Sequence, residues 1–239
     1  MTFKRILLKL SGEALQGPRE FGIDLAVIRI LAEQIKQARQ LGPDIGVVVG
    51  GGNYLRGLEM SAAGMDRAQA DYMGMLGTVM NGMAVQDALE KADVPTRLQT
   101  AIPMQSVAEP FIRRRAIRHM EKGRVVIFAA GTGNPFVTTD TAGALRAMEV
   151  DADALVMLKN KVDGVYNVDP RKVSSATKLD RLTYNQAINM ETTGIDPTAI
   201  TMCRDNRMPI IVMRSPESPH DAELVRLIQG EAVGTLISE

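Results

Sequence analysis

The chain has 239 residues, and its 28 Lys and Arg side chains are balanced by 28 Asp and Glu side chains. A chain without net charge has no overall field to attract nucleic acid or an anionic membrane, so neither is expected as a partner. The single cysteine excludes an internal disulfide, one cysteine and two histidines argue against a zinc site, and no signal segment opens the chain, so we expect a cytoplasmic protein.

Short apolar runs alternate with stretches of helical periodicity in the first two thirds of the chain. Asp24 is placed to cap a helix that Gly42 ends, and the continuous apolar run Ile45–Val49 is typical of a strand covered on both faces. In chain order the pattern predicts strands at 6–10, 45–49, 97–100, 125–129 and 154–158, with helices at 25–41, 65–92, 110–122 and 138–149. This order predicts an α/β fold, a three-layer sandwich with a mostly parallel central sheet.

The pattern changes after residue 162. Asp163-Gly164 and Asp169-Pro170 are turn signals. Beyond them we expect short helices near Tyr184 and Pro197, a strand at 210–213, a helix at 219–229 and a last strand at 235–237. The length fits one domain of residues 1–239, and in a parallel sheet ligands bind beyond the carboxyl ends of the strands.

A lysine lies near the end of the first predicted strand, and a serine and a glycine follow the strand. Lys9 at the end of a buried strand requires an anionic partner, and the N–H groups of Ser11 and Gly12 can approach a phosphate. The alternative is a surface lysine before a turn, and this segment by itself does not exclude it.

Three consecutive glycines, Gly50–Gly52, follow the second strand and precede Arg56. They let the backbone pass close to a ligand, whereas a tight turn needs only one glycine, so an anion site is favoured. The run is not a Walker A loop, because no Gly-Lys-Ser/Thr ends it. It also fails the dinucleotide fingerprint, because Leu55 occupies the third glycine position.

A third loop, residues 130–140, leads from a strand into a helix. Thr138, Thr139 and Asp140 lie at the helix start, where unpaired N–H groups and the helix dipole favour anions. Simple capping explains only one of the three. Phe136 replaces the third glycine of a dinucleotide fingerprint here too.

The segment after the fifth strand carries two lysines. Lys159 and Lys161 can neutralise phosphates, and Tyr166 can stack on a base. A solvated turn is the alternative for this segment taken alone.

Together these segments resemble the bacterial uridylate (UMP) kinases of the amino-acid kinase family. The matching segments are 5–14, 50–53, 65–67, 71–75, 130–140, 162–166 and 234–237, and the resemblance covers nearly the whole chain. Gly-Thr-Gly-Asn-Pro-Phe at 131–136 and Asp-Tyr-Met-Gly-Met at 71–75 separate these enzymes from other members of the family. The resemblance implies an amino-acid kinase fold and reversible transfer of the γ-phosphate of ATP, with Mg²⁺, to UMP in de novo pyrimidine biosynthesis.

The resemblance also implies roles for individual residues. Lys9, Asp140 and Lys159 would be catalytic, with Lys161 the rival for the last position. ATP would be bound by Lys9, Leu10, Ser11, Gly12, Gly52, Arg56, Asn160, Tyr166 and Asp169. UMP would be bound by Gly51, Asp71, Thr132, Gly133, Asn134, Pro135, Phe136, Val137, Thr138 and Thr139. Residues 1–150 would form the acceptor side and 151–239 the ATP side. Val137 departs from the family, where phenylalanine is more usual.

Regulation and assembly are further implications of the resemblance. Related enzymes are hexamers that GTP activates and UTP inhibits, and their allosteric stretch corresponds to Gly17, Pro18, Arg19, Glu20, Phe21 and Gly22. Arg113–Arg115 and Arg118 fit a solvated helix face better than an effector site. The methionines clustered at 73–83 predict packing in the core or at a subunit interface.

The chemistry of this reaction agrees with the residues. Phosphoryl transfer needs positioning and neutralised charge, and a phosphate acceptor with a second pKa near ~6 needs no general base. We therefore expect Lys9→Ala to abolish turnover more than it weakens UMP binding. Three alternatives stay open, namely a kinase for a carboxylate or carbamate, a non-catalytic nucleotide-binding protein, and a dinucleotide-dependent oxidoreductase.

Overall fold

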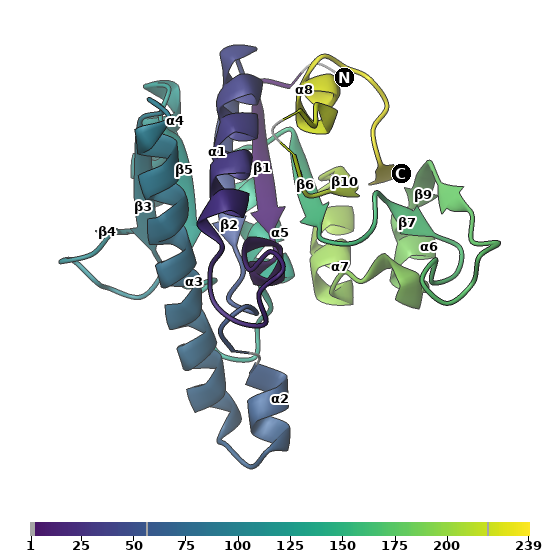
Figure 1. Ribbon diagram of the computed structural model, residues 1–239, viewed down its shortest axis with the longest axis horizontal. Helices are drawn as coiled ribbons and strands as arrows, with labels where there is room; N and C mark the ends of the chain where they lie inside the picture. Colours follow the sequence, from purple (N-terminus) through teal and green to yellow (C-terminus); the bar gives the residue numbers. More distant parts are fainter. Residues whose placement is uncertain (1–2, 56, 219) are drawn as a thin grey trace.

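A twisted sheet with helices on both faces forms the centre of the computed structural model, which describes residues 3–55, 57–218 and 220–239 (Figure 1). In these residues nine strands follow the order β4-β3-β5-β2-β1-β6-β10-β11-β9. They are β1 (Arg5–Leu10), β2 (Asp44–Val49), β3 (Thr96–Thr100), β4 (Glu109–Pro110), β5 (Val125–Ala129), β6 (Ala154–Lys159), β9 (Arg181–Thr183), β10 (Ile210–Arg214) and β11 (Thr235–Ser238). Neighbouring strands are parallel except β10 and β11, and β7 (Val165–Tyr166) pairs with β8 (Lys178–Leu179) in a separate antiparallel ribbon.

The helices form the two outer layers. They are α1 (Leu25–Gln40), α2 (Gly57–Ala62), α3 (Arg67–Lys91), α4 (Arg113–Glu121), α5 (Thr139–Glu149), α6 (Tyr184–Ile188), α7 (Pro197–Asp205) and α8 (Glu223–Ile228), with 3₁₀ turns at Gly12–Leu15 and Glu191–Thr193. Ile6 and Leu8 of β1 share a buried cluster with α1, α3 and α8, while Leu7 joins α4, α5 and α7. This alternation is why both faces of β1 carry apolar side chains at Ile6, Leu7 and Leu8.

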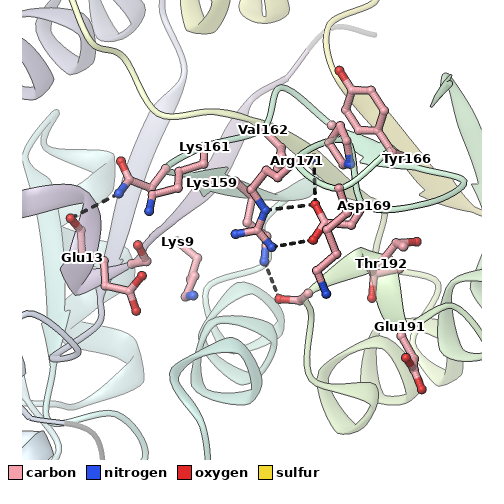
Figure 2. A pocket seen from close by; sticks show the side chains of 17 residues that line it. Lys9, Glu13, Lys159, Lys161, Val162, Tyr166, Asp169, Arg171, Glu191 and Thr192 are labelled. Atoms are coloured by element: carbon pink, nitrogen blue, oxygen red, sulfur yellow. Dashed lines mark hydrogen bonds and ion pairs between the residues drawn. The ribbon is translucent and has the colours of Figure 1, made fainter. Parts of the chain in front are cut away.

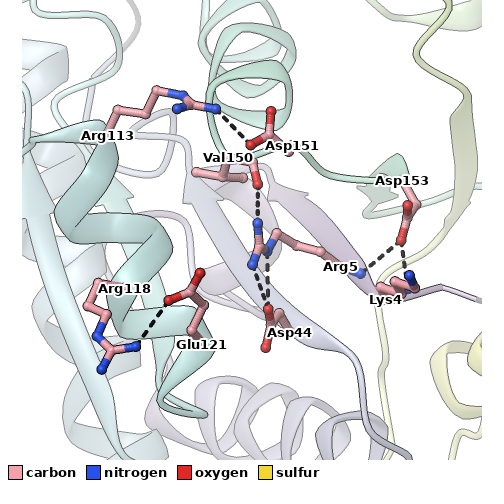
Figure 3. A network of polar contacts seen from close by, with 9 residues as sticks. All are labelled: Lys4, Arg5, Asp44, Arg113, Arg118, Glu121, Val150, Asp151 and Asp153. Atoms are coloured by element: carbon pink, nitrogen blue, oxygen red, sulfur yellow. Dashed lines mark hydrogen bonds and ion pairs between the residues drawn. The ribbon is translucent and has the colours of Figure 1, made fainter.

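The amino ends of the central strands are held together by polar contacts. Arg5 donates from Nη2 to Oδ2 of Asp44 at 2.8 Å and from Nη1 to the carbonyl of Val150 at 2.6 Å, which joins β1, β2 and the end of α5 (Figure 3). Oδ2 of Asp153 accepts the N–H groups of Lys4 and Arg5. The opposite, carboxyl edge of the sheet is where the glycine loops lie.

The expected fold class is confirmed, and most strands lie where the pattern predicts them. Two helix starts differ by three or more residues, and one helix was not predicted. The helix expected from residue 110 begins at Arg113, because Pro110 pairs with Thr100 in the short strand β4. α8 begins at Glu223, and residue 219 lies outside the described residues. α2 was not predicted, because none of its residues is buried and it therefore has no apolar periodicity.

Within the described ranges, none of the helices combines the length and the apolar character that crossing a membrane requires.

Candidate active site

The four polar segments singled out in the sequence meet at one edge of the sheet. β5, β2, β1 and β6 are adjacent and parallel, so the loops that follow them lie side by side. The chain order changes direction between β1 and β6, with β2 on one side of β1 and β6 on the other. Ligands of open α/β sheets bind at such a switch point.

A buried ion pair lies at the centre of this edge. Lys9 Nζ is 2.5 Å from Oδ1 of Asp140, and both side chains are about nine-tenths buried. Lys9 extends from β1, and Asp140 lies in the first turn of α5, which Thr138 caps through its hydroxyl. Gly143 lets α5 approach the stem of Lys9, because a Cβ there would already touch it at 3.4 Å. The helix start thus places a carboxylate beside the lysine at the strand end.

Lys159 completes this charged group from β6. Burial alone would raise the pKa of Asp140, but the ammonium groups of Lys9 and Lys159 and the N–H of Asp196 outweigh it, and the pKa lies below its ordinary value. Burial lowers the pKa of Lys159 to about 8, with Lys9 acting in the same direction and Asp140 against it. Two cations and one anion therefore share this site, which leaves one positive charge to meet an anionic ligand when Lys159 is protonated.

Two residues between the second 3₁₀ turn and α7 hold this group in place. Nζ of Lys159 donates to the carbonyl of Gly194 at 2.6 Å, and the N–H of Asp196 donates to Oδ2 of Asp140 at 3.1 Å. Oδ2 of Asp196 accepts the hydroxyls of Thr138 and Thr141 at 2.6 and 2.8 Å. Sequence reasoning missed these contacts, since the partners are more than thirty residues apart and share no local motif.

A cavity of about 710 Å³ lies beside the ion pair (Figure 2). Of the residues predicted to bind ATP, it is lined by Lys9, Ser11, Asn160, Tyr166 and Asp169, together with both candidates for the second lysine, Lys159 and Lys161. Arg171, Glu191 and Thr192 also line it and were not predicted. Arg171 holds the carboxylate of Asp169 through two hydrogen bonds, and this contact lowers the pKa of Asp169 to about 2.

A second cavity of about 370 Å³ lies on the α3 side of the ion pair. Of the residues predicted for UMP it is lined by Gly51, Asp71, Thr132, Val137, Thr138 and Thr139. Gly52, which the resemblance assigns to ATP, lines this second cavity, and it lies against Gly12 at the boundary of the two loops. Because Lys9 lines the first cavity and Thr139 the second, the Lys9–Asp140 pair lies between them.

Those of the remaining predicted residues that the structure describes line neither of these two cavities. Leu10, Gly12 and Asp140 are buried behind the lining residues. Gly133 packs near Ala101, and Phe136 is 69% exposed. Asn134 and Pro135 belong to the same loop as these two. Arg56 lies outside the described residues.

Asp71 joins α3 to the loop after β5. Its Oδ2 accepts the N–H of Phe136 at 2.8 Å and Nε of Arg67 at 2.9 Å, and the guanidinium of Arg67 lies 5.6 Å from the centre of the Phe136 ring. Thr78 of the same helix accepts the N–H of Ala130 at 2.7 Å. Contacts from α3 to Ala130 and to Phe136 therefore hold the loop after β5, which forms part of the wall of the second cavity, at two points.

Gly57 packs against Asp71, and replacing it by alanine is expected to damage the second cavity selectively. A Cβ at Gly57 would lie 2.1 Å from Oδ1 of Asp71, so the carboxylate has to move. We expect KM for a substrate bound in the second cavity to rise about tenfold or more, with a smaller change for a substrate of the first cavity, as steady-state kinetics would measure. Gly64→Ala, where nothing lies within 4 Å but φ is +101°, is the control for backbone strain alone. Equal effects of the two changes would contradict the role of Asp71.

In the described residues no group of three or more His, Cys, Asp or Glu side chains is arranged to hold a metal ion. The predicted allosteric stretch, residues 17–22, lies in the loop between the first 3₁₀ turn and α1. Arg113, Arg115 and Arg118 belong to α4, where Arg113 and Arg118 pair with Asp151 and Glu121 (Figure 3).

Comparison with known proteins agrees with the fold and the site. The model of the amino acid kinase family matches residues 4–214. A crystal structure of UMP kinase from Bacillus anthracis is 36% identical and superposes with a TM-score of 0.93, covering 100% of this chain and 97% of the other. UMP kinase from Ureaplasma parvum is 33% identical with a TM-score of 0.90, covering 100% of both chains. Uridylate kinase from Archaeoglobus fulgidus is 28% identical with a TM-score of 0.74, covering 98% of this chain and 99% of that one.

The family match extends over most of the chain and includes β1, the three glycine loops and Lys159. Solved structures above 30% identity cover the whole chain and share its fold. The chain belongs to the amino acid kinase family.

Proposed function

We propose that this protein transfers the γ-phosphate of ATP to UMP, giving ADP and UDP. One observation carries the proposal, namely that a buried Lys9–Asp140 pair separates a large cavity from a smaller one, with Lys159 beside it. The solved structures with the highest identity quoted above are UMP kinases, which supports UMP as the acceptor. An enzyme that joins two anionic substrates needs such a cationic group between two sites.

ATP is assigned to the first cavity. Its volume of about 710 Å³ is within the usual range for small-molecule and cofactor sites. We assign the γ-phosphate to the part of the cavity beside Lys9 and Lys159, because Lys9 pairs there with Asp140, while Tyr166 lies on the other side of the cavity (Figure 2). Mg²⁺ enters as part of the substrate Mg·ATP, held mainly by the phosphate oxygens, as is usual for this ion.

UMP is assigned to the second cavity, with its phosphate at the start of α5. Thr138 and Thr139 line the cavity there, and the N-terminal N–H groups of a helix bind anions. Asp71 lines the opposite wall, where a carboxylate can accept a ribose hydroxyl. This assignment makes residues 1–150 the acceptor side, although Lys9 and Ser11 reach the donor cavity from it.

The reaction then needs no protein nucleophile and no general base. A phosphate oxygen of UMP forms a bond to the γ-phosphorus while the bond from that phosphorus to the β,γ-bridging oxygen breaks, and ADP leaves with the electron pair. UMP is largely dianionic at neutral pH because its second pKa is near ~6. Lys9 and Lys159 neutralise charge on the transferred group, and Asp140 keeps the two ammonium groups oriented.

The test is ADP release from Mg·ATP with UMP, CMP, AMP and GMP in turn. We expect strong turnover with UMP and little with the other three. Turnover with a carboxylate or carbamate acceptor and not with UMP would replace the proposed acceptor. Nucleotide binding without turnover, in the presence or absence of GTP, would favour a non-catalytic binding protein.

Homo-oligomeric assembly, with a hexamer as the expected form, is part of the same proposal. Tyr72, Leu76, Met80 and Met83 share one face of α3 and are each 40–47% exposed. Apolar side chains at this spacing form a continuous stripe, and such stripes mark interaction surfaces. Activation by GTP, inhibition by UTP, a role in pyrimidine biosynthesis and a cytoplasmic location complete the proposal.

Placing a charge in this stripe is expected to weaken the assembly. Met80→Glu puts a carboxylate at its centre, and burying that carboxylate in an apolar contact is costly. Light scattering after size exclusion should show smaller species for Met80→Glu, whereas Gln40→Glu at the exposed end of α1 should leave the mass unchanged. An unchanged mass for Met80→Glu would exclude this face from the interface.

A further inference from the structure

Two buried asparagines, Asn53 and Asn81, are bonded to each other below the glycine loop. Asn53 is 3% exposed and Asn81 is fully buried. Asn53 Nδ2 donates to Oδ1 of Asn81 at 2.9 Å, and Asn81 Nδ2 donates to Oδ1 of Asn53 at 2.7 Å. Each amide has one N–H left over, and each uses it on a backbone carbonyl.

Those two carbonyls belong to different loops. Asn81 Nδ2 donates to the carbonyl of Gly50 at 2.7 Å, and Asn53 Nδ2 donates to that of Gly22 at 2.8 Å. The N–H of Gly22 in turn donates to the carbonyl of Asn53 at 3.0 Å. Asn53 therefore holds both polar groups of Gly22, at the end of segment 17–22, and Asn81 fixes the start of the glycine loop from α3.

The contact with Gly50 sets the direction of the next peptide N–H. Within one trans peptide group, the carbonyl and the following N–H point in opposite directions. Because the Gly50 carbonyl points at Asn81, the N–H of Gly51 points away from Asn81, and Gly51 lines the second cavity. The glycine loop is also bonded to the end of β1, because the N–H of Gly50 donates to the carbonyl of Leu10 at 2.8 Å.

The neighbouring lysine loop is packed against this pair. A Cβ at Gly12 would lie 2.5 Å from Oδ1 of Asn53 and 2.6 Å from the N atom of Gly52. Movement of the Asn53 amide would therefore displace the loop that follows Lys9. Asparagine is also a weak helix former, so its place in the middle of α3 needs a reason beyond local structure.

We propose that Asn53 and Asn81 are positioning residues, which orient the Gly50–Gly51 peptide toward the acceptor phosphate and join segment 17–22 to that loop. The inference rests on the proposed transfer to UMP and names the device that aligns the acceptor. Within the described residues, Asn53 and Asn81 line neither of the two cavities, so they act through Gly51 and Gly12.

The first experiment compares Asn53→Ala, Asn81→Ala and the double variant by steady-state kinetics. We expect each single change to lower kcat/KM for UMP at least tenfold, mainly through kcat. The double variant should lose no more of kcat/KM for UMP than the more damaged single variant, because either single change already breaks the same hydrogen-bonded pair. Asn81→Asp keeps the shape of the side chain but removes its amide donors, and it should lower kcat/KM for UMP as much as Asn81→Ala does.

A matched control separates positioning from general loss of stability. Leu89→Ala removes a fully buried side chain from the same helix, eight positions farther on, where it packs in the core. We expect it to lower Tm, with kinetic constants at a temperature well below Tm within about twofold of the wild type. Equal kinetic losses in Leu89→Ala and Asn81→Ala would overturn the proposal, as would wild-type kinetics for Asn81→Asp.

The link to segment 17–22 has its own readout. On adding UMP we expect slower hydrogen exchange in the peptide that contains Gly22, because the ligand fixes the loop that holds Gly22. This protection should disappear in Asn53→Ala. Unchanged protection in that variant would overturn the link. Turnover of UMP by the wild-type enzyme tests the proposed function by itself. The ratio of kcat/KM between variant and wild type, together with hydrogen exchange, tests the positioning role. The proposed function and the positioning role can therefore fail separately.

Discussion

Replacing Lys9 by alanine is expected to lower kcat by roughly 10³-fold or more while UMP still binds, since comparable charge clamps contribute this much to phosphoryl transfer. Lys9 is the buried cation between the two cavities, and in the proposed reaction its ammonium group would neutralise the charge of the transferred phosphoryl group. The second cavity, whose lining does not include Lys9, keeps its shape. The measurement is single-turnover ADP formation, together with UMP binding by calorimetry.

The same change leaves the carboxylate of Asp140 without its nearest cation. Losing one partner of a buried ion pair costs about 3–5 kcal/mol of folding free energy, so Tm must be followed. The double variant Lys9→Ala with Asp140→Asn removes the uncompensated charge, and it should recover Tm without recovering kcat. Lys4→Ala changes an exposed lysine just before the same strand and should leave both unchanged. Near-normal kcat for Lys9→Ala in a folded protein would refute the role of Lys9.

Lys159→Ala is expected to lower kcat by roughly 10²-fold, whereas Lys161→Ala should change it less than about threefold. Both lysines line the first cavity, but the charge of Lys159 lowers the pKa of Asp140, and Lys159 also donates to the carbonyl of Gly194. Lys161 is exposed. The pair of variants therefore decides which lysine is catalytic, since they differ by two positions in one segment. A larger loss in Lys161→Ala would reverse the assignment.

The pH dependence gives a second readout of Lys159. Burial lowers its pKa to about 8, so kcat/KM for ATP, which reports the free enzyme, should fall as pH rises through about 8. Lys159→Arg keeps its charge over this range and should abolish that fall if it remains active. Because the folded pKa lies below the ordinary lysine value of 10.5, the folded state binds fewer protons between these values, and the free energy of unfolding should rise with pH there. A flat profile between pH 7 and 9 would contradict this assignment.

The short segment Gly194–Asp196 explains how three charged side chains from three elements stay aligned. It accepts from Lys159, donates to Asp140 and, through the carboxylate of Asp196, accepts from Thr138 at the start of α5. Thr138 lines the second cavity and Lys159 the first. The same segment therefore supports the walls of both cavities, which the proposed reaction assigns to UMP and ATP.

Local patterns in the sequence were sufficient for most of the fold. Continuous apolar runs predicted the buried strands, because a strand covered on both faces has no polar side. Glycines and a lysine directly after strands predicted where the loops of the site lie, since parallel strands bring their carboxyl ends to one edge. Helix α2 was not predicted, because none of its residues is buried and it has no apolar face.

Which side chains meet was decided only by the tertiary structure. The sequence identified Lys9, Asp140 and one of two lysines as candidate catalytic residues. Their positions near strand ends and at a helix start did not show which of these side chains contact one another. The choice of contacts depends on pairs far apart in the chain, such as Lys159 with Gly194 and Asn81 with Gly50. Such pairs have no spacing that a local pattern can reveal, because packing of α3, α5 and α7 on the sheet brings them within hydrogen-bonding distance.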